Sequence, residues 1–206
     1  MLKEKRNVFI QRMHAKRIQD VISIDESGFQ KQMGSKYAYA PSGTKVYHQT
    51  TSQRHQNYSL ILAISSSLVI ASKILKGGVK KEAFHAFLND ELLPACGTRK
   101  YTFLLDNVRF HHSKSIKQLI ISHGHSIEYT PPYSPDLNPV ECVFSVLKSK
   151  VRKQHCLTVT ELITFLNNTL AQIHGFEKMF MHSLTGSELS NEGRSRIILF
   201  NNKTSS

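Results

Sequence analysis

Short runs of apolar and β-branched residues recur along the chain at the length of buried strands. Five runs have this character: 21–24, 58–64, 68–75, 101–105 and 126–129. Apolar residues at helical spacing follow the last three of them, over 79–92, 113–123 and 139–151. Strands joined by a tight turn pair antiparallel, whereas strands joined by a helix pair in parallel. The pattern therefore predicts an α/β fold, with a mixed sheet between two layers of helices.

Length and composition favour one domain. In a chain of 206 residues we expect one packed domain over 20–175, after a basic helical lead-in at 1–19 and before a C-terminal tail at 176–206. Pro and Gly in 41–44 predict a hairpin turn. The apolar run 60–64 is far shorter than the about 18–20 residues of a membrane helix, so no membrane contact is expected. Three cysteines without metal-ligand spacing argue against a disulfide scaffold or a cysteine zinc site.

The charge balance indicates a polyanionic partner. The chain has 27 Lys and Arg against 15 Asp and Glu, a net charge of +12 and a pI near 9.7. No acidic residue lies between Glu26 and Glu82, where eight Lys and Arg occur, and none lies between Cys142 and Thr160. Nucleic acid is the commonest polyanion bound in this way. The alternative is a basic surface that only solvent covers.

Two carboxylates stand at the ends of predicted strands. Asp25 closes the run 21–24, and Asp106 closes the run 101–105. Buried strands disfavour charge, so each needs a reason. If the two strands are parallel neighbours, both side chains emerge at one edge of the sheet. Two such anions repel unless a cation lies between them, and Mg²⁺ prefers oxygen ligands of this kind.

A third carboxylate comes from Glu141, in the first turn of the helix that follows Pro139. Its alternative role is local, because Asn138 and Glu141 have the spacing of a capping box and an acid is favoured there by the helix dipole. Glu26 lies beside Asp25 but on the opposite face of the strand, which makes it a weaker ligand candidate.

Two segments carry a family resemblance. Residues 104–113 read LLDNVRFHHS, and residues 131–141 read PPYSPDLNPVE, with 34 residues between Asp106 and Glu141. Together with IDESGF at 24–29, these segments resemble the catalytic core of the mariner-like superfamily of DDE transposases, in particular its insertion-sequence-type branch. The resemblance extends over roughly residues 15–155, and the proline-rich block is its most specific part.

The resemblance implies an RNase H-like fold, with a mixed five-stranded sheet flanked by helices. It implies Asp25, Asp106 and Glu141 as a catalytic triad that binds Mg²⁺, for which Mn²⁺ can substitute. The implied activity is cleavage and joining of DNA strands, on double-stranded transposon ends and a target. Family analogy also suggests a homodimer on DNA, nuclear in a eukaryotic host and otherwise cytoplasmic.

Relatives carry a helix-turn-helix DNA-binding region before this core, and only 24 residues precede Asp25 here. We therefore expect a catalytic domain alone, a truncated copy or a fragment of a split element. Two other functions stay open: a catalytically inactive or domesticated DNA-binding protein on the same fold, and an RNase H-like nuclease that cuts without joining strands.

Further residues are assigned supporting roles. Asn107, His112 and Asn138 are expected beside the carboxylates, where they would orient them. DNA contacts are expected from six basic residues, each of which has a solvated surface position as its alternative: Lys45, Arg54, Arg109, Lys148, Arg152 and Lys153. Lys148 and Arg152 follow Glu141 by seven and eleven residues, so they share its helix face.

Overall fold

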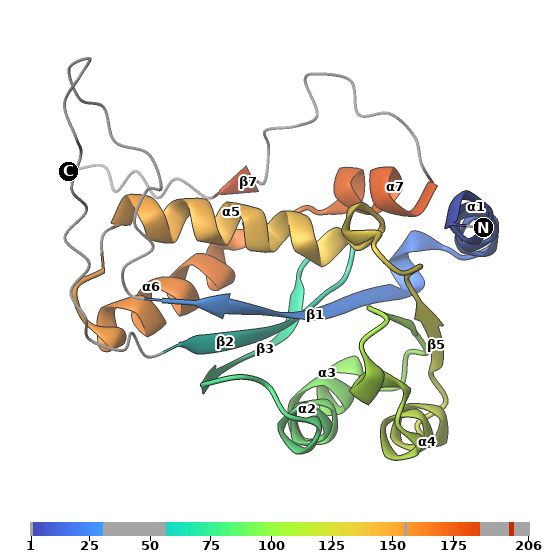
Figure 1. The fold of residues 1–206 in the computed structure, drawn as a ribbon, viewed down its shortest axis with the longest axis horizontal. Coiled ribbons are helices and arrows are strands. Elements are labelled where there is room, and N and C mark those ends of the chain that lie inside the picture. The colour runs from blue at the N-terminus through green and yellow to red at the C-terminus, as the bar shows by residue number, and fades with distance from the viewer. Residues whose placement is uncertain (1, 31–56, 155, 186–197, 200–206) are drawn as a thin grey trace.

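A five-stranded mixed sheet separates two layers of helices (Figure 1). The computed structural model describes residues 2–30, 57–154, 156–185 and 198–199. The sheet has the order β3-β2-β1-β4-β5, with these bounds: β1 Val21–Phe29, β2 Tyr58–Ile64, β3 Val69–Lys76, β4 Thr102–Leu105 and β5 Ser126–Tyr129. β1, β2 and β3 pair antiparallel, whereas β4 and β5 run parallel to β1. The predicted mixed sheet of five strands is therefore confirmed.

The first strand is longer than the sequence pattern suggested. β1 does not end at Asp25 but continues to Phe29, and it pairs with β2 along Ser23–Phe29. The apolar pattern is interrupted at Asp25-Glu26-Ser27, yet antiparallel pairing supplies backbone hydrogen bonds whatever the side chains are. Asp25 consequently lies within a central strand rather than in the turn that follows one.

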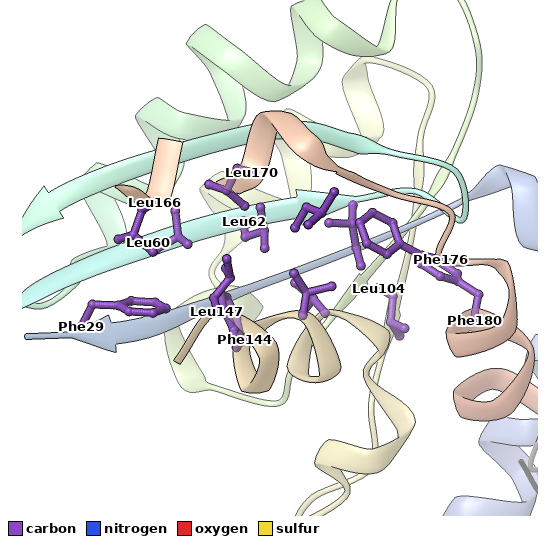
Figure 2. Packing of buried hydrophobic residues seen from close by; sticks show 14 of the residues in the cluster. Phe29, Leu60, Leu62, Leu104, Phe144, Leu147, Leu166, Leu170, Phe176 and Phe180 are labelled. Carbon is purple, nitrogen blue, oxygen red and sulfur yellow. The ribbon is translucent and has the colours of Figure 1, made fainter. Parts of the chain in front are cut away.

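One face of the sheet is covered by four helices. They are α1 Leu2–His14, α5 Pro139–Gln154, α6 Val159–Gln172 and α7 Glu177–Thr185. Their apolar side chains pack with Phe29, Leu60, Leu62 and Leu104 of the sheet in one continuous core (Figure 2). The helix α6 begins as its capping pattern predicts, because the Thr158 hydroxyl accepts a hydrogen bond of 3.1 Å from the backbone N–H of Glu161.

The opposite face of the sheet is covered by the segment between β3 and β4 and by the helix between β4 and β5 (Figure 1). The elements are α2 Lys81–Phe87, a π-helical turn η2 Leu88–Leu92, α3 Leu93–Cys96 and α4 Lys114–Ser122. Residues 22, 24 and 61 of the sheet point into this second core, whereas residues 21, 60 and 62 point into the first. The alternation along the central strands β1, β2 and β4 thus gives them two buried faces, as expected for a three-layer fold, whereas the edge strands β3 and β5 are only partly buried.

Both ends of the expected domain are more closely packed than predicted. Phe9 and Met13 of α1 are buried in the first core, so the N-terminal helix is part of the domain and not only a lead-in. Beyond residue 175, Phe176, Phe180 and Leu184 are buried in the same core, and α7 contacts α1 and α5. The core therefore extends past the expected boundary at residue 175. The apolar residues of α7 lie on one face of the helix and are separated in the sequence by polar residues, so the sequence pattern did not indicate a buried helix.

The predicted hairpin around residues 41–44 lies outside the described residues. A short pairing joins β6 Ile173–His174 to β7 Ile198–Leu199. Within the part of the chain that the structure describes, none of the helices combines the length and the apolar composition required to cross a lipid bilayer.

Replacing Phe180 with alanine tests whether α7 belongs to the core. Phe180 is fully buried, so Phe180→Ala should lower the free energy of unfolding by about 3–5 kcal/mol. The matched control is Met181→Ala on the same helix, because Met181 is 44% exposed and should cost well under half as much. Urea unfolding measures both. Equal small effects would mean that α7 is a detachable tail.

Candidate active site

Asp25 is a buried carboxylate in the middle of the sheet. It is 6% exposed and lies on the β1 face that α5 covers, between Ser23 and Ser27 on the same face. Its Oδ1 accepts a hydrogen bond of 2.7 Å from the backbone N–H of Glu26. Its Oδ2 accepts one of 2.9 Å from Asn138 Nδ2. These two donors compensate in part for the loss of water around the carboxylate.

Asn138 supports Asp25 instead of capping its own helix. While its amide nitrogen donates to Asp25, its Oδ1 accepts a hydrogen bond of 2.5 Å from the Ser23 hydroxyl. That hydroxyl in turn accepts from the backbone N–H of Val140 at 3.2 Å. The Asn138 side chain therefore does not cap α5. The Ser23 hydroxyl accepts from the first turn of α5 in its place, and the Asn138 side chain binds the buried carboxylate of Asp25.

Asp106 directly follows β4 and is held by a histidine. The register of β1 with β4 pairs Ser23 with Leu104, and two residues further on it brings Asp106 alongside Asp25. Asp106 Oδ1 lies 2.6 Å from His111 Nδ1 and accepts from the backbone N–H of Val108 at 3.1 Å. The two aspartates thus emerge at one edge of the sheet, as their strand positions predicted.

The neighbouring histidine takes a different place from the one expected. His112 contacts Asn107, with Nε2 2.6 Å from Oδ1, and its ring stacks on Tyr129. His111 is instead the residue that touches Asp106. The signal was ambiguous because adjacent histidines in a short turn point to opposite sides, and only the packing of that turn decides which one faces inward.

Glu141 completes a pocket at this edge. It lies in the first turn of α5, half-buried, and shares a cavity of about 420 Å³ with Asp25, Asp106 and Asn107. The proline-rich segment 130–135 and Asn138 form the rest of the wall. Glu141 lines the pocket and also lies in the first turn of its own helix, so its position is compatible with metal binding as well as with helix capping.

The three carboxylates influence one another electrostatically. Burial raises the pKa of Asp25 to about 8, and the charge on Asp106 adds to the rise. Burial also raises the pKa of Glu141, although Lys148 opposes this. The pKa of Asp106 is lowered: burial would raise it, but the hydrogen bonds from His111 and Val108 outweigh burial. For His111, burial would lower the pKa, yet its bonds to Asp106 and Glu26 raise it to about 9.

The chemistry of this pocket suits a divalent cation. Crowded carboxylate oxygens are the ligands that Mg²⁺ and Mn²⁺ prefer, and a cation would offset the repulsion that raises the Asp25 pKa. Within the described residues, however, no three His, Cys, Asp or Glu side chains are close enough together to hold a metal ion as they stand. The three carboxylates therefore line one pocket, but the described residues do not place them within reach of a shared ion.

The rim of the pocket is a stiff segment anchored from both sides. The Thr130 N–H donates to the Leu105 carbonyl at 2.9 Å, which fixes the segment to the end of β4. Asp136 in the short η4 Pro135–Leu137 forms a two-pronged ion pair with Arg6 of α1. Tyr133, between these anchors, is 93% exposed and has a φ of 54°. The N-terminal helix therefore helps to position the rim of the site.

The expected DNA-contacting residues are spread over several elements. Lys148 is half-buried on α5 and close enough to Glu141 to lower its pKa, which agrees with the shared helix face. Arg152 and Lys153 are exposed in the last turn of α5. Arg109 is exposed in the short helix η3 Arg109–His112 and does not line the pocket. Lys45 and Arg54 lie outside the described residues.

The arrangement defines a class of fold. A mixed sheet with three antiparallel and two further parallel strands, helices on both faces, one carboxylate within β1 and another just after β4 is the RNase H-like architecture. Solved structures with this fold include a Mos1 mariner paired-end complex with Mn (TM-score 0.76, 18% identity), whose match covers 90% of this chain and 58% of that one. A Mos1 strand transfer complex matches with a TM-score of 0.75 and 18% identity, over 89% and 57%. The isolated catalytic domain of Mos1 mariner transposase matches with a TM-score of 0.68 and 17% identity, over 90% and 87%.

The family follows from the sequence itself. The model of the DDE superfamily endonucleases matches residues 20–163, and the chain belongs to that family. No curated protein sequence matches it. The chain spans about 58% of the length of the Mos1 paired-end complex chain and 87% of the isolated catalytic-domain chain.

The raised pKa of Asp25 predicts a pH dependence of stability. Between the unfolded value near 3.8 and about 8, the folded protein holds more protons than the unfolded chain, so the free energy of unfolding falls as pH rises. Asp25→Asn should make this decline shallower in metal-free buffer. The raised pKa of His111 also makes the free energy of unfolding fall as pH rises. The measured quantity is therefore the difference in slope between Asp25→Asn and wild type, obtained by urea unfolding at pH 5 to 8.5.

The control for that experiment is Asp90→Asn, an exposed aspartate in the π-helical turn η2, away from the pocket. This change should leave the slope of stability against pH as in wild type. An Asp25→Asn slope equal to that of wild type would mean that Asp25 is ionised throughout this range.

Proposed function

We propose that this chain is the catalytic domain of a transposase that cleaves DNA strands and joins them to a target in a metal-dependent reaction. One observation carries the proposal: a carboxylate buried within the central strand shares a pocket with two further carboxylates, in a chain of the DDE endonuclease family. A buried carboxylate whose pKa is raised to about 8 by burial and by its neighbour is typical of functional sites.

The residues proposed to carry the reaction are Asp25, Asp106 and Glu141. They would hold two divalent ions, which when bound activate the attacking hydroxyl and stabilise the leaving oxygen of the phosphodiester. The chain's own contribution is to hold the carboxylates in place. Asn138 fixes Asp25, and His111 fixes Asp106. Glu141, at the start of α5, is the member with the fewest supporting bonds to other side chains among the described residues.

Mg²⁺ is the proposed ion, with Mn²⁺ as a substitute. Structures similar to this chain are Mos1 complexes with Mn and with Mg, and the oxygen-rich pocket suits both ions. Because Asp25 must lose its proton to bind an ion, the apparent affinity for Mg²⁺ should increase with pH up to about 8.

Double-stranded DNA, as transposon ends and target, is the proposed substrate. The net charge of +12 and the basic end of α5 support it, and the similar structures are paired-end and strand transfer complexes. We further propose a homodimer on DNA and a location with the genome, in the nucleus of a eukaryotic host or in the cytoplasm otherwise.

Asp106→Asn tests the chemistry. The amide keeps the shape of the side chain but removes the negative charge that a divalent ion requires. The variant should lose Mg²⁺-dependent nicking and strand transfer on a pre-cut DNA end, by at least two orders of magnitude, while it stays folded. Gel assays of strand products measure the activity, with melting temperatures recorded with and without Mg²⁺.

The outcomes separate the candidate functions. A wild type that gains no stability from Mg²⁺ and leaves pre-cut ends intact would be a DNA-binding protein without catalysis. Cleavage without joining would favour an RNase H-like nuclease. An Asp106→Asn variant as active as wild type would remove Asp106 from the triad.

The salt dependence of DNA binding tests the basic face of α5. Each phosphate contact contributes about 0.9 to the slope of log affinity against log salt. Replacing Lys148 and Arg152 together with alanine should therefore reduce that slope by up to about 1.8. The charge-matched control replaces the exposed Lys3 and Lys178, on α1 and α7. Equal slopes for both double variants would mean that the α5 pair is a solvated surface, and fluorescence anisotropy at several salt concentrations decides this.

A further inference from the structure

His111 is a fully buried imidazole that bridges two carboxylates, one on β1 and one just after β4. Its Nδ1 lies 2.6 Å from Asp106 Oδ1, and its Nε2 lies 3.1 Å from Glu26 Oε1. Its side chain has no exposed area, whereas those of Glu26 and Asp106 are 14% and 29% exposed. Both ring nitrogens are therefore used within the protein, so the histidine itself has no nitrogen left for a metal ion or for DNA.

The ring cannot turn away from this position. It packs against Phe84 at 4.5 Å and against Phe110 at 4.3 Å between ring centroids. The hydroxyl of Tyr129 donates to the backbone carbonyl of His111 at 3.0 Å and so ties the short helix η3 to β5. The imidazole is thus fixed by packing on its faces and by a hydrogen bond at each nitrogen.

Glu26 reaches this histidine because of the alternation along β1. Asp25 points to the α5 face of the sheet and into the pocket, while Glu26 points to the opposite face, on which Ile22 and Ile24 are buried. The two adjacent acids of β1 therefore have different tasks. Asp25 is itself a proposed metal ligand, whereas Glu26 contacts His111, which in turn contacts Asp106.

The contact selects one oxygen of Asp106. Both the imidazole and the backbone N–H of Val108 bond to Oδ1. Among the described residues no hydrogen bond to Oδ2 is seen. Since a carboxylate after the last residue of a strand can otherwise rotate, these two bonds fix its plane and leave the second oxygen for an ion in the pocket.

We propose that His111 and Glu26 form a positioning pair that orients Asp106 for metal binding. This inference rests on the proposed function, because it assigns a task within the same site. Neither residue touches the substrate or the reacting atoms; both act through Asp106. Partners that orient a metal ligand in this way typically change metal affinity or activity by 10- to 100-fold when they are replaced.

The test measures binding of Mg²⁺ itself, by titration calorimetry on the full chain without DNA. His111→Gln and Glu26→Gln should each weaken Mg²⁺ binding, by about 10- to 100-fold for His111→Gln and by a smaller factor for Glu26→Gln, which leaves the imidazole in place. Strand transfer by His111→Gln should recover in part with saturating Mg²⁺ and more fully with Mn²⁺, which binds N and O ligands more tightly.

The matched control is His125→Gln. His125 is also a buried histidine beside the sheet, 6% exposed and stacked on Phe103, and its Nδ1 accepts from the backbone N–H of Tyr101. It does not line the pocket. This variant should lose stability to a similar extent and keep the Mg²⁺ affinity of wild type.

The outcomes keep this inference apart from the proposed function. Unchanged Mg²⁺ affinity in His111→Gln, or an equal loss in His125→Gln, would overturn the positioning role while wild-type cleavage still supports the transposase. If His111→Gln does not fold, Glu26→Gln decides the matter, and wild-type affinity in that variant overturns the proposal. A wild type that neither binds Mg²⁺ nor cleaves DNA contradicts the proposed function itself.

Discussion

The burial of Asp25 within β1 governs the arrangement around it. A carboxylate without water on a central strand is costly unless donors reach it and unless it can shed its charge or share it with a cation. Two donors reach it: its neighbour's backbone N–H and Asn138. Asn138 stands at the start of α5, so the same contact that satisfies the carboxylate also fixes the helix that carries Glu141. The hydrogen bond that compensates for the burial of Asp25 thus also determines the position of Glu141.

The parallel pairing of β1 and β4 supplies the second constraint. β4 ends at Leu105, and the register that pairs Ser23 with Leu104 brings Asp106 beside Asp25 within β1. From there the two faces of β1 are used differently. One face presents Asp25 to the pocket, and the other presents Glu26 to His111, which holds Asp106 from behind. Each aspartate is thereby supported by a side chain from another element.

The helices at the two ends of the chain belong to this arrangement. α1 and α7 pack on the same core as α5, and Arg6 of α1 pairs with Asp136 in the rim of the pocket. Arginine–carboxylate pairs with two parallel bonds are geometrically specific, so this contact fixes the proline-rich segment relative to α1. The domain therefore depends for its site on residues well outside the central strands, including the apolar face of α7.

Much of this could be predicted from the sequence, because strand length, helical periodicity and turn residues are local properties. The runs 58–64 and 126–129 coincide with β2 and β5, and Asp25 and Asp106 lie on neighbouring parallel strands as predicted, although β1 continues past Asp25. What local pattern could not decide was which partner each polar group would find. Asn138, which has the sequence of a cap and was also expected beside the carboxylates, holds Asp25, whereas His111, not His112, faces Asp106. Those choices depend on which side chain is buried once β1, β4 and η3 are packed together, since only burial makes one hydrogen-bond partner obligatory and leaves its neighbour to solvent.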